Sequence, residues 1–128
     1  MASVNVIILY STKAMKPVGT NIRYERSRNM AYESKLKRDD IDQLFDAVLT
    51  LEDREDCYRF FEDICTINEI HAIAQRLQVA KLLSEGKTYS EIENVTKAST
   101  ATISRINKCL VYGAEGYQRI LERMKDSE

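Results

Sequence analysis

The chain of 128 residues contains only one histidine, one proline and three cysteines, which limits the kinds of site it can build. Cys57, Cys65 and Cys109 include no Cys-x-x-Cys pair, and His71 has no cluster of ligands spaced around it, so we predict no metal and no cofactor. A histidine without a partner nucleophile or carboxylate forms no active site, so we predict that the protein is not an enzyme. With no secretory signal, we expect a cytoplasmic protein whose cysteines are reduced and behave as small hydrophobic side chains.

The sequence also lacks a hydrophobic run long enough to cross a membrane. The N-terminal stretch VNVIILY (4–10) is far shorter than the roughly 20 residues that a bilayer requires, and it has no small-residue cleavage site of a signal peptide. We therefore expect no membrane partner. A strand of this length finds no partner strand in an otherwise helical chain, so we predict that residues 1–34 form a flexible tail or pair with another chain.

Met30 offers a different explanation of this tail. The codons for Glu25, Arg26 and Ser27 can read GAA-AGG-AGT, a purine-rich ribosome-binding sequence at a suitable distance before the Met30 codon. We therefore keep the hypothesis that Met30 is the natural start and that residues 1–29 are upstream sequence read in frame. Other Arg and Ser codons in the gene would exclude it. The alternative is a genuine flexible extension, such as a basic arm that contacts DNA.

The formal net charge of −1 hides a strong asymmetry along the chain. Residues 39–69 carry eleven acidic side chains and only two basic ones, Arg54 and Arg59, whereas basic residues slightly prevail after this segment. Residues 97–112 contain no acidic side chain at all. Because a nucleic-acid surface must not repel phosphate, we predict that such a surface lies in the C-terminal half, with the acidic helices turned away from it.

Hydrophobic periodicity predicts six helices and no sheet, in one domain that spans residues 35–126. The first helix begins at Asp39 and Asp40, whose charges oppose the positive end of the helix dipole, and the second begins near Glu52. Both are amphipathic. The apolar stripe of the first helix is Ile41, Leu44, Phe45, Val48 and Leu49, and the second helix is predicted to bury Tyr58, Phe61, Ile64 and Cys65.

A long third helix follows, and it is expected to be the centre of the fold. Thr66 and Glu69 form a capping box at its start, and Gly86 ends it. Its apolar residues cover more than one face, so it should touch several elements of its own chain and a partner chain. Gly113 and Gly116 mark a break before the last helix. Broad apolar faces in so small a chain favour a homodimer.

Residues 88–110 are predicted to form two short helices joined by a tight turn. Thr88 and Glu91 form a second capping box, and Ile92 and Val95 give the first of these helices a narrow buried stripe. The second helix is predicted to follow the N-cap Ser99 and to bury Ile103, Ile106 and Leu110.

The opposite face of this second helix is small, polar and basic, and it would fit the major groove of DNA. Short side chains near its start let the backbone approach the bases, and hydroxyl groups can bind phosphates or base edges. Arg105 and Lys108 add positive charge. The alternative is an ordinary helical hairpin whose polar face is merely solvated. The residues predicted to contact DNA are Thr88, Tyr89, Ser90, Lys97, Ser99, Thr100, Ala101, Ser104, Arg105 and Lys108.

The ordered combination of RLQVAKLLSEG (76–86), TYSEI (88–92) and TATISRINKCL (100–110) resembles the Trp-repressor-like helix-turn-helix family, and within it the YerC/YecD branch. With the flanking helices, the resemblance covers residues 35–124. It implies an all-α, intertwined homodimer whose two helix-turn-helix motifs project outward. It also implies double-stranded DNA as the partner, and hence a transcriptional regulator.

The resemblance implies a corepressor pocket as well, but this chain departs from the family there. Ile106 stands where the family has a small glycine against which the tryptophan indole packs, and a branched side chain should fill that space. Cys109 replaces a serine. We therefore predict no tryptophan corepressor. The positions that match the family's pocket are Thr66, Arg76, Thr102, Arg105, Ile106 and Cys109.

The DNA-contacting positions match the family better on the recognition helix than on the helix before it. Thr100, Ala101 and Ser104 occupy base-reading positions, whereas one residue is missing from the turn that precedes the first helix. On that first helix the family's polar and basic contacts correspond to Tyr89, Ser90 and Glu93. We predict a homodimeric DNA-binding regulator that does not respond to tryptophan. The alternative is a helical dimeric adaptor for protein interactions that has lost DNA binding.

Overall fold

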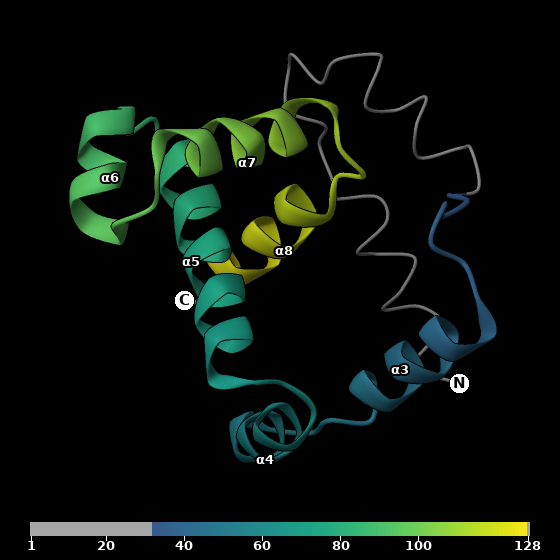
Figure 1. Ribbon diagram of the computed structural model, residues 1–128. Coiled ribbons are helices and arrows are strands. Elements are labelled where there is room, and N and C mark those ends of the chain that lie inside the picture. The colour runs from purple at the N-terminus through teal and green to yellow at the C-terminus, as the bar shows by residue number, and fades with distance from the viewer. Residues whose placement is uncertain (1–31, 128) are drawn as a thin grey trace, which may run out of the picture. The chain divides into compact units, whose positions relative to one another are not determined.

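The computed structural model describes residues 32–127, and this part of the chain forms six α-helices and no strand (Figure 1). The prediction of six helices in an all-α fold is confirmed. Most of the predicted tail, together with the possible start at Met30, lies outside the described residues. The helices are α3 (Asp39–Val48), α4 (Arg54–Ile64), α5 (Ile67–Ser84), α6 (Tyr89–Thr96), α7 (Thr100–Tyr112) and α8 (Gly116–Lys125).

The chain divides into two compact units, the first ending at Thr50, and α3 is the described helix of this first unit. Three aspartates in its first turn oppose the positive end of the helix dipole. Arg38 pairs with Asp40 and holds the pKa of that carboxyl below its ordinary value. No residue of α3 is buried, and Phe45 and Leu49 are 53% and 82% exposed. The helix is amphipathic as predicted, and of its apolar stripe Ile41 and Val48 are half-buried while the other three residues are exposed.

The second unit begins at Leu51 and opens with α4, which is stabilised locally. The carboxylate of Asp53 accepts a hydrogen bond from the backbone N–H of Asp56 at 2.9 Å, as an N-cap does. The prediction that α4 buries Tyr58 and Ile64 is wrong for the single chain, because their side chains are 64% and 50% exposed. A short helix is stabilised mainly by the elements that pack on it. In the single chain, part of the apolar face of α4 has no such element over it and lines an open groove.

The long helix α5 is the centre of the second unit, as its broad apolar surface predicts. It contacts α6, α7 and α8, and Figure 1 shows α7 crossing the C-terminal end of α5. Its capping box is present as predicted: the Thr66 hydroxyl accepts from the Glu69 backbone N–H, while the Glu69 carboxylate accepts from the Thr66 N–H at 2.7 Å. Gly86, with a φ of 80°, ends the helix in the left-handed conformation that glycine adopts without strain.

The buried core of the second unit lies between α5 and the helix pair α6–α7. Seven hydrophobic residues form it, and α8 closes it with a single buried side chain. The cluster is Val79, Ala80, Ile92, Ala98, Ile103, Ile106 and Leu121. Four of the seven belong to the segment 88–110, so this segment is built into the core through one face and leaves the other free.

The cysteines differ in their exposure, and Cys65, predicted to be buried, is only half-buried. All three are free thiols, and Cys57 and Cys109 are exposed while Cys65 is half-buried. Cys109 lies between Ile106 and Leu110 in sequence but to one side of the buried stripe of α7, so it faces solvent in the single chain. No helix among residues 32–127 is long and apolar enough to cross a membrane.

The break between α7 and α8 depends on Gly113, which makes a testable contrast with Gly116. A Cβ at position 113 would lie 2.2 Å from the carbonyl oxygen of Cys109, whereas a Cβ at position 116 meets nothing within 4 Å. Gly113→Ala should therefore destabilise the protein by about 1–3 kcal/mol through overpacking. Gly116→Ala, in the first turn of α8, should be neutral or stabilise by up to about 1 kcal/mol, because alanine favours helix. Urea denaturation measures both, and an equal stability of the two variants would contradict the steric explanation.

Candidate nucleic-acid interface

The first helix of the pair, α6, starts at a complete capping box. The backbone N–H of Thr88 donates to the Glu91 carboxylate at 2.8 Å and the Thr88 hydroxyl donates to it at 3.0 Å. In return, the hydroxyl oxygen accepts from the Glu91 backbone N–H. The backbone and hydroxyl bonds from Thr88, and the charge of Lys87, hold the pKa of Glu91 below its ordinary value. The predicted start of the motif is confirmed.

The turn between the helices is held by hydrogen bonds from side chains as well as the backbone. Lys97 adopts the left-handed conformation with a φ of 59°, and its N–H donates to the Glu93 carbonyl at 2.9 Å. The Thr96 hydroxyl donates to the Ile92 carbonyl at 2.7 Å and accepts from the Ala98 N–H. The backbone N–H groups of Lys97 and Ala98 thus both find a partner close to the turn.

Helix α7 begins at Ser99, whose hydroxyl accepts from the Thr102 backbone N–H at 3.2 Å, as predicted for its N-cap. Ile103 and Ile106 are buried, and Leu110 is half-buried against the core. The predicted stripe of α7 is therefore confirmed. Because this face is fixed in the core, the polar face of the same helix is directed to solvent.

The structure places nine of the ten predicted DNA contacts on the surface. Tyr89 is the exception, because it is half-buried and packs against the core. It therefore has less side-chain surface to offer than the sequence suggested. The exposed residues are Thr88, Ser90, Lys97, Ser99, Thr100, Ala101, Ser104, Arg105 and Lys108.

The buried stripe of α6 differs from the prediction at one position. Val95 is 59% exposed, whereas Thr96, one residue later, is only 8% exposed. Thr96 can be buried because its hydroxyl hydrogen-bonds within the turn. The prediction rested on only two apolar residues, Ile92 and Val95. Positions 95 and 96 lie three and four residues after Ile92, so either can share its face of the helix.

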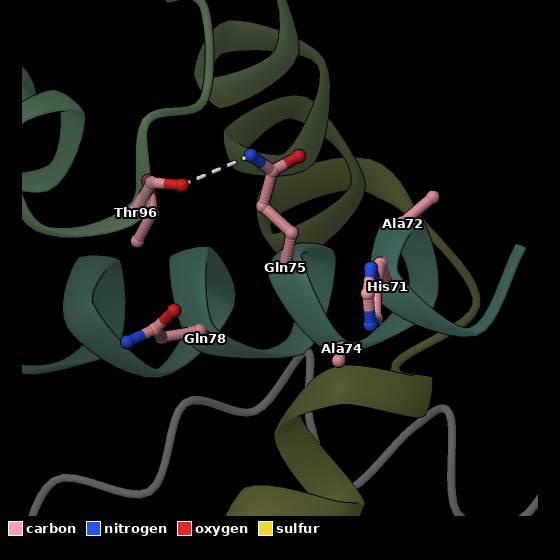
Figure 2. Close-up of a pocket in the computed structure, with 6 residues that line it drawn as sticks. All are labelled: His71, Ala72, Ala74, Gln75, Gln78 and Thr96. Carbon is pink, nitrogen blue, oxygen red and sulfur yellow. Dashed lines mark hydrogen bonds between the residues drawn. The ribbon is translucent and has the colours of Figure 1, made fainter. Parts of the chain in front are cut away.

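A glutamine that the sequence did not single out joins α5 to the turn. The side-chain amide nitrogen of Gln75 donates to the carbonyl oxygen of Thr96 at 3.0 Å, as Figure 2 shows. The two residues line an open recess of about 730 Å³ together with His71, Ala72, Ala74 and Gln78. Long-range pairing of this kind has no signal in sequence spacing.

A model of the Trp repressor protein family matches residues 39–125, which include all six helices. The chain belongs to the Trp repressor family. The matched residues include α6 and α7, the helix pair predicted to form a helix-turn-helix.

Similar proteins come from several bacteria. The chain is 56% identical over 94 residues to YerC, an uncharacterized protein of Bacillus subtilis strain 168, a match that covers 73% of this chain and 90% of YerC. A crystal structure described as that of a proposed Trp repressor from Staphylococcus aureus is 55% identical, with a TM-score of 0.69, and the match covers 71% of this chain and 91% of that one. A TrpR-like protein from Eubacterium eligens ATCC 27750 is 54% identical with the same TM-score, over 71% and 94% of the two chains.

The positions that match the Trp repressor family's ligand pocket have mixed surroundings in this chain. Ile106 is only 3% exposed and belongs to the hydrophobic core. The Thr66 hydroxyl is engaged in capping α5, and the Thr102 hydroxyl lies 3.0 Å from that of Ser99. Arg76, Arg105 and Cys109 are exposed. Among residues 32–127, no three His, Cys, Asp or Glu side chains group as a metal site would require.

Proposed function

We propose that the protein binds double-stranded DNA through α7 and regulates transcription. The observation that carries the proposal is the division of α7 into two faces. Its apolar face is fixed in the core by Ile103 and Ile106, while a face with hydroxyl, methyl and cationic groups and no acidic residue is exposed. Such a helix can enter a major groove, with Thr100, Ala101 and Ser104 near base edges and the cationic groups near phosphate.

Membership of the Trp repressor family supports a regulator rather than an enzyme. A regulator of this kind needs no catalytic group, and we propose no catalytic residue and no cofactor. Because its proposed partner is genomic DNA, we propose that the protein acts in the cytoplasm of a bacterium.

We further propose that the DNA-binding form is a homodimer. Between α4 and α5 runs an apolar groove of about 570 Å³, which includes Tyr58, Phe61, Ile73 and Leu77 in its lining. Exposed apolar surface of this kind is what a stable dimer covers. Two-fold symmetry would set two recognition helices about one duplex turn apart, ~34 Å, facing a palindromic site.

The dimer proposal predicts a difference between two exposed apolar positions. Ile73 lines the groove and is 51% exposed, while Val95 on α6 is 59% exposed and lies outside the groove. Ile73→Asp should convert the protein to a monomer, because a charge would be desolvated in the interface. Val95→Asp should leave a dimer. Light scattering after size-exclusion chromatography measures the mass, and circular dichroism checks that both variants remain folded. A wild-type protein with the mass of one chain would refute the proposal.

Tryptophan is not the proposed effector. The Ile106 side chain occupies core space where the family's pocket has a small residue, so the indole ring would have to displace a packed branched side chain. Isothermal titration calorimetry with L-tryptophan should therefore show no saturable heat. A DNA titration of the same sample provides the check that the protein is active. A saturable tryptophan signal would overturn this proposal without affecting that of DNA binding.

Genome-wide footprinting tests the proposed function most directly. The native protein should protect a limited set of related sites, and Thr100→Ala and Arg105→Ala should protect them more weakly, since both residues lie on the exposed face of α7. A second candidate function is that of a protein-interaction adaptor, and two exposed residues of α6 favour it. Glu93 would repel phosphate, and Val95 offers apolar surface to a protein partner. The absence of any enriched site would favour the adaptor.

A further inference from the structure

The reversal of the chain between α6 and α7 leaves a carbonyl that needs a partner. Helix α6 ends at Thr96. The last carbonyl groups of a helix receive no hydrogen bond from an N–H group of the same helix. Thr96 is almost fully buried, so an unpaired carbonyl there would be costly. The side-chain amide of Gln75 donates to this carbonyl across a separation of 21 residues.

A second glutamine makes the same kind of bond at the other end of α7. The side-chain amide of Gln118, on α8, donates to the carbonyl oxygen of Leu110 at 2.7 Å. Both glutamines are half-buried, and each meets a carbonyl near the C-terminal end of a helix. The two bonds differ in their position along the chain. Gln75 bonds to the turn before Thr100, Ala101 and Ser104, whereas Gln118 bonds to a carbonyl after these residues.

We propose that Gln75 is a positioning residue that sets the orientation of α7 by fixing the turn against α5. The proposal rests on the proposed DNA binding of α7. Ala98 packs the turn into the core, whereas the Thr96 hydroxyl forms hydrogen bonds only within its own segment. Gln75 adds to this packing a directional hydrogen bond from the central helix to the turn. A rigid turn presents Thr100 and Ala101 in one orientation, and that is what sequence-specific contact requires.

The recess beside Gln75 indicates what its removal would do. It is open to solvent, so water can reach the Thr96 carbonyl once the glutamine amide is gone (Figure 2). Water satisfies the carbonyl but does not tie it to α5. The fold should therefore survive the substitution, while the turn samples additional orientations.

The test compares Gln75→Met with Gln118→Met. Methionine keeps the length of the side chain and removes its donor, so each variant loses one hydrogen bond to a helix-terminal carbonyl. Amide hydrogen exchange of Lys97 and Ala98 should become about two- to tenfold faster in Gln75→Met, the factor that one net hydrogen bond contributes. In Gln118→Met the exchange of these two amides should be unchanged. Thermal unfolding of both variants checks that their losses of stability are similar.

DNA affinity provides the second measurement. Gln75→Met should weaken binding to the footprinted site by about the same two- to tenfold. The reason is that only the fraction of molecules whose turn has the orientation required for binding can bind the site. Its binding to unrelated DNA should not change, since phosphate contacts do not need one orientation of α7. Equal losses of specific affinity in Gln75→Met and Gln118→Met would overturn the proposal. If the wild-type protein binds no DNA, the proposed function fails, and the exchange rates still decide whether Gln75 fixes the turn.

Discussion

Ile92→Ala should lower the free energy of unfolding by about 2–5 kcal/mol. The Ile92 side chain is fully buried, at 0% exposure, between the helix-turn-helix and the central helix. Truncation to alanine removes three carbon atoms from a site whose neighbours, Val79 and Ala80 of α5 among them, belong to the same buried cluster. The loss combines the transfer free energy of the deleted atoms with the cost of the cavity that remains.

Val95→Ala is the matched control, since it lies three residues further along the same helix. The side chain is 59% exposed, so its truncation should change stability by no more than about 0.5 kcal/mol. The better helix propensity of alanine over valine offsets part of any loss. Denaturant titrations of both variants give the two free energies. A large loss of unfolding free energy for Val95→Ala in a sample shown to be monomeric would mean that the Val95 side chain is buried and that α6 is rotated about its axis.

The affinity for DNA should fall by about 10³-fold or more between about 50 mM and about 200 mM salt, if the dimer neutralises about six to ten phosphates. Counterions released from those phosphates produce this slope. The cationic groups available on the exposed face of the motif include Lys97, Arg105 and Lys108. An affinity that hardly depends on salt would indicate that the surface does not bind the phosphate backbone and would favour the adaptor.

Arg105→Ala should weaken binding and reduce the salt slope by about one per subunit if Arg105 contacts phosphate. Arg119→Ala is the control: Arg119 is also exposed but belongs to α8 and not to α7. It should leave both the affinity and the slope nearly unchanged. Fluorescence anisotropy with the footprinted duplex, at four or more salt concentrations, measures both quantities. Equal effects of the two substitutions would show that only overall charge matters.

Most of the secondary structure could be predicted because its causes are local. The capping boxes at Thr66 and Thr88 join groups three residues apart, and Ser99 caps α7 through the backbone N–H of Thr102. The helix-ending role of Gly86 follows from its own conformational freedom. Such interactions form whatever the rest of the chain does, so their residue types can be recognised in sequence.

Burial was harder to predict, and the errors share one cause. Tyr58, Ile64 and Val95 are apolar residues at helical spacing, yet the single chain leaves all three exposed. Periodicity identifies the apolar face of a helix but does not say which element covers it. Where the dimer proposed above forms, part of this surface should be covered by the partner.

By itself, the sequence determined the six helices, the caps of α5, α6 and α7, the end of α5 at Gly86, and the cationic, acid-free face of α7. The tertiary structure alone decided that Thr96 rather than Val95 is buried, that Tyr89 packs against the core, and that Gln75 reaches the turn from α5. The physical reason is the separation along the sequence of the groups that interact. A cap depends on groups within one helical turn, whereas burial and a hydrogen bond across 21 residues depend on how separate helices pack.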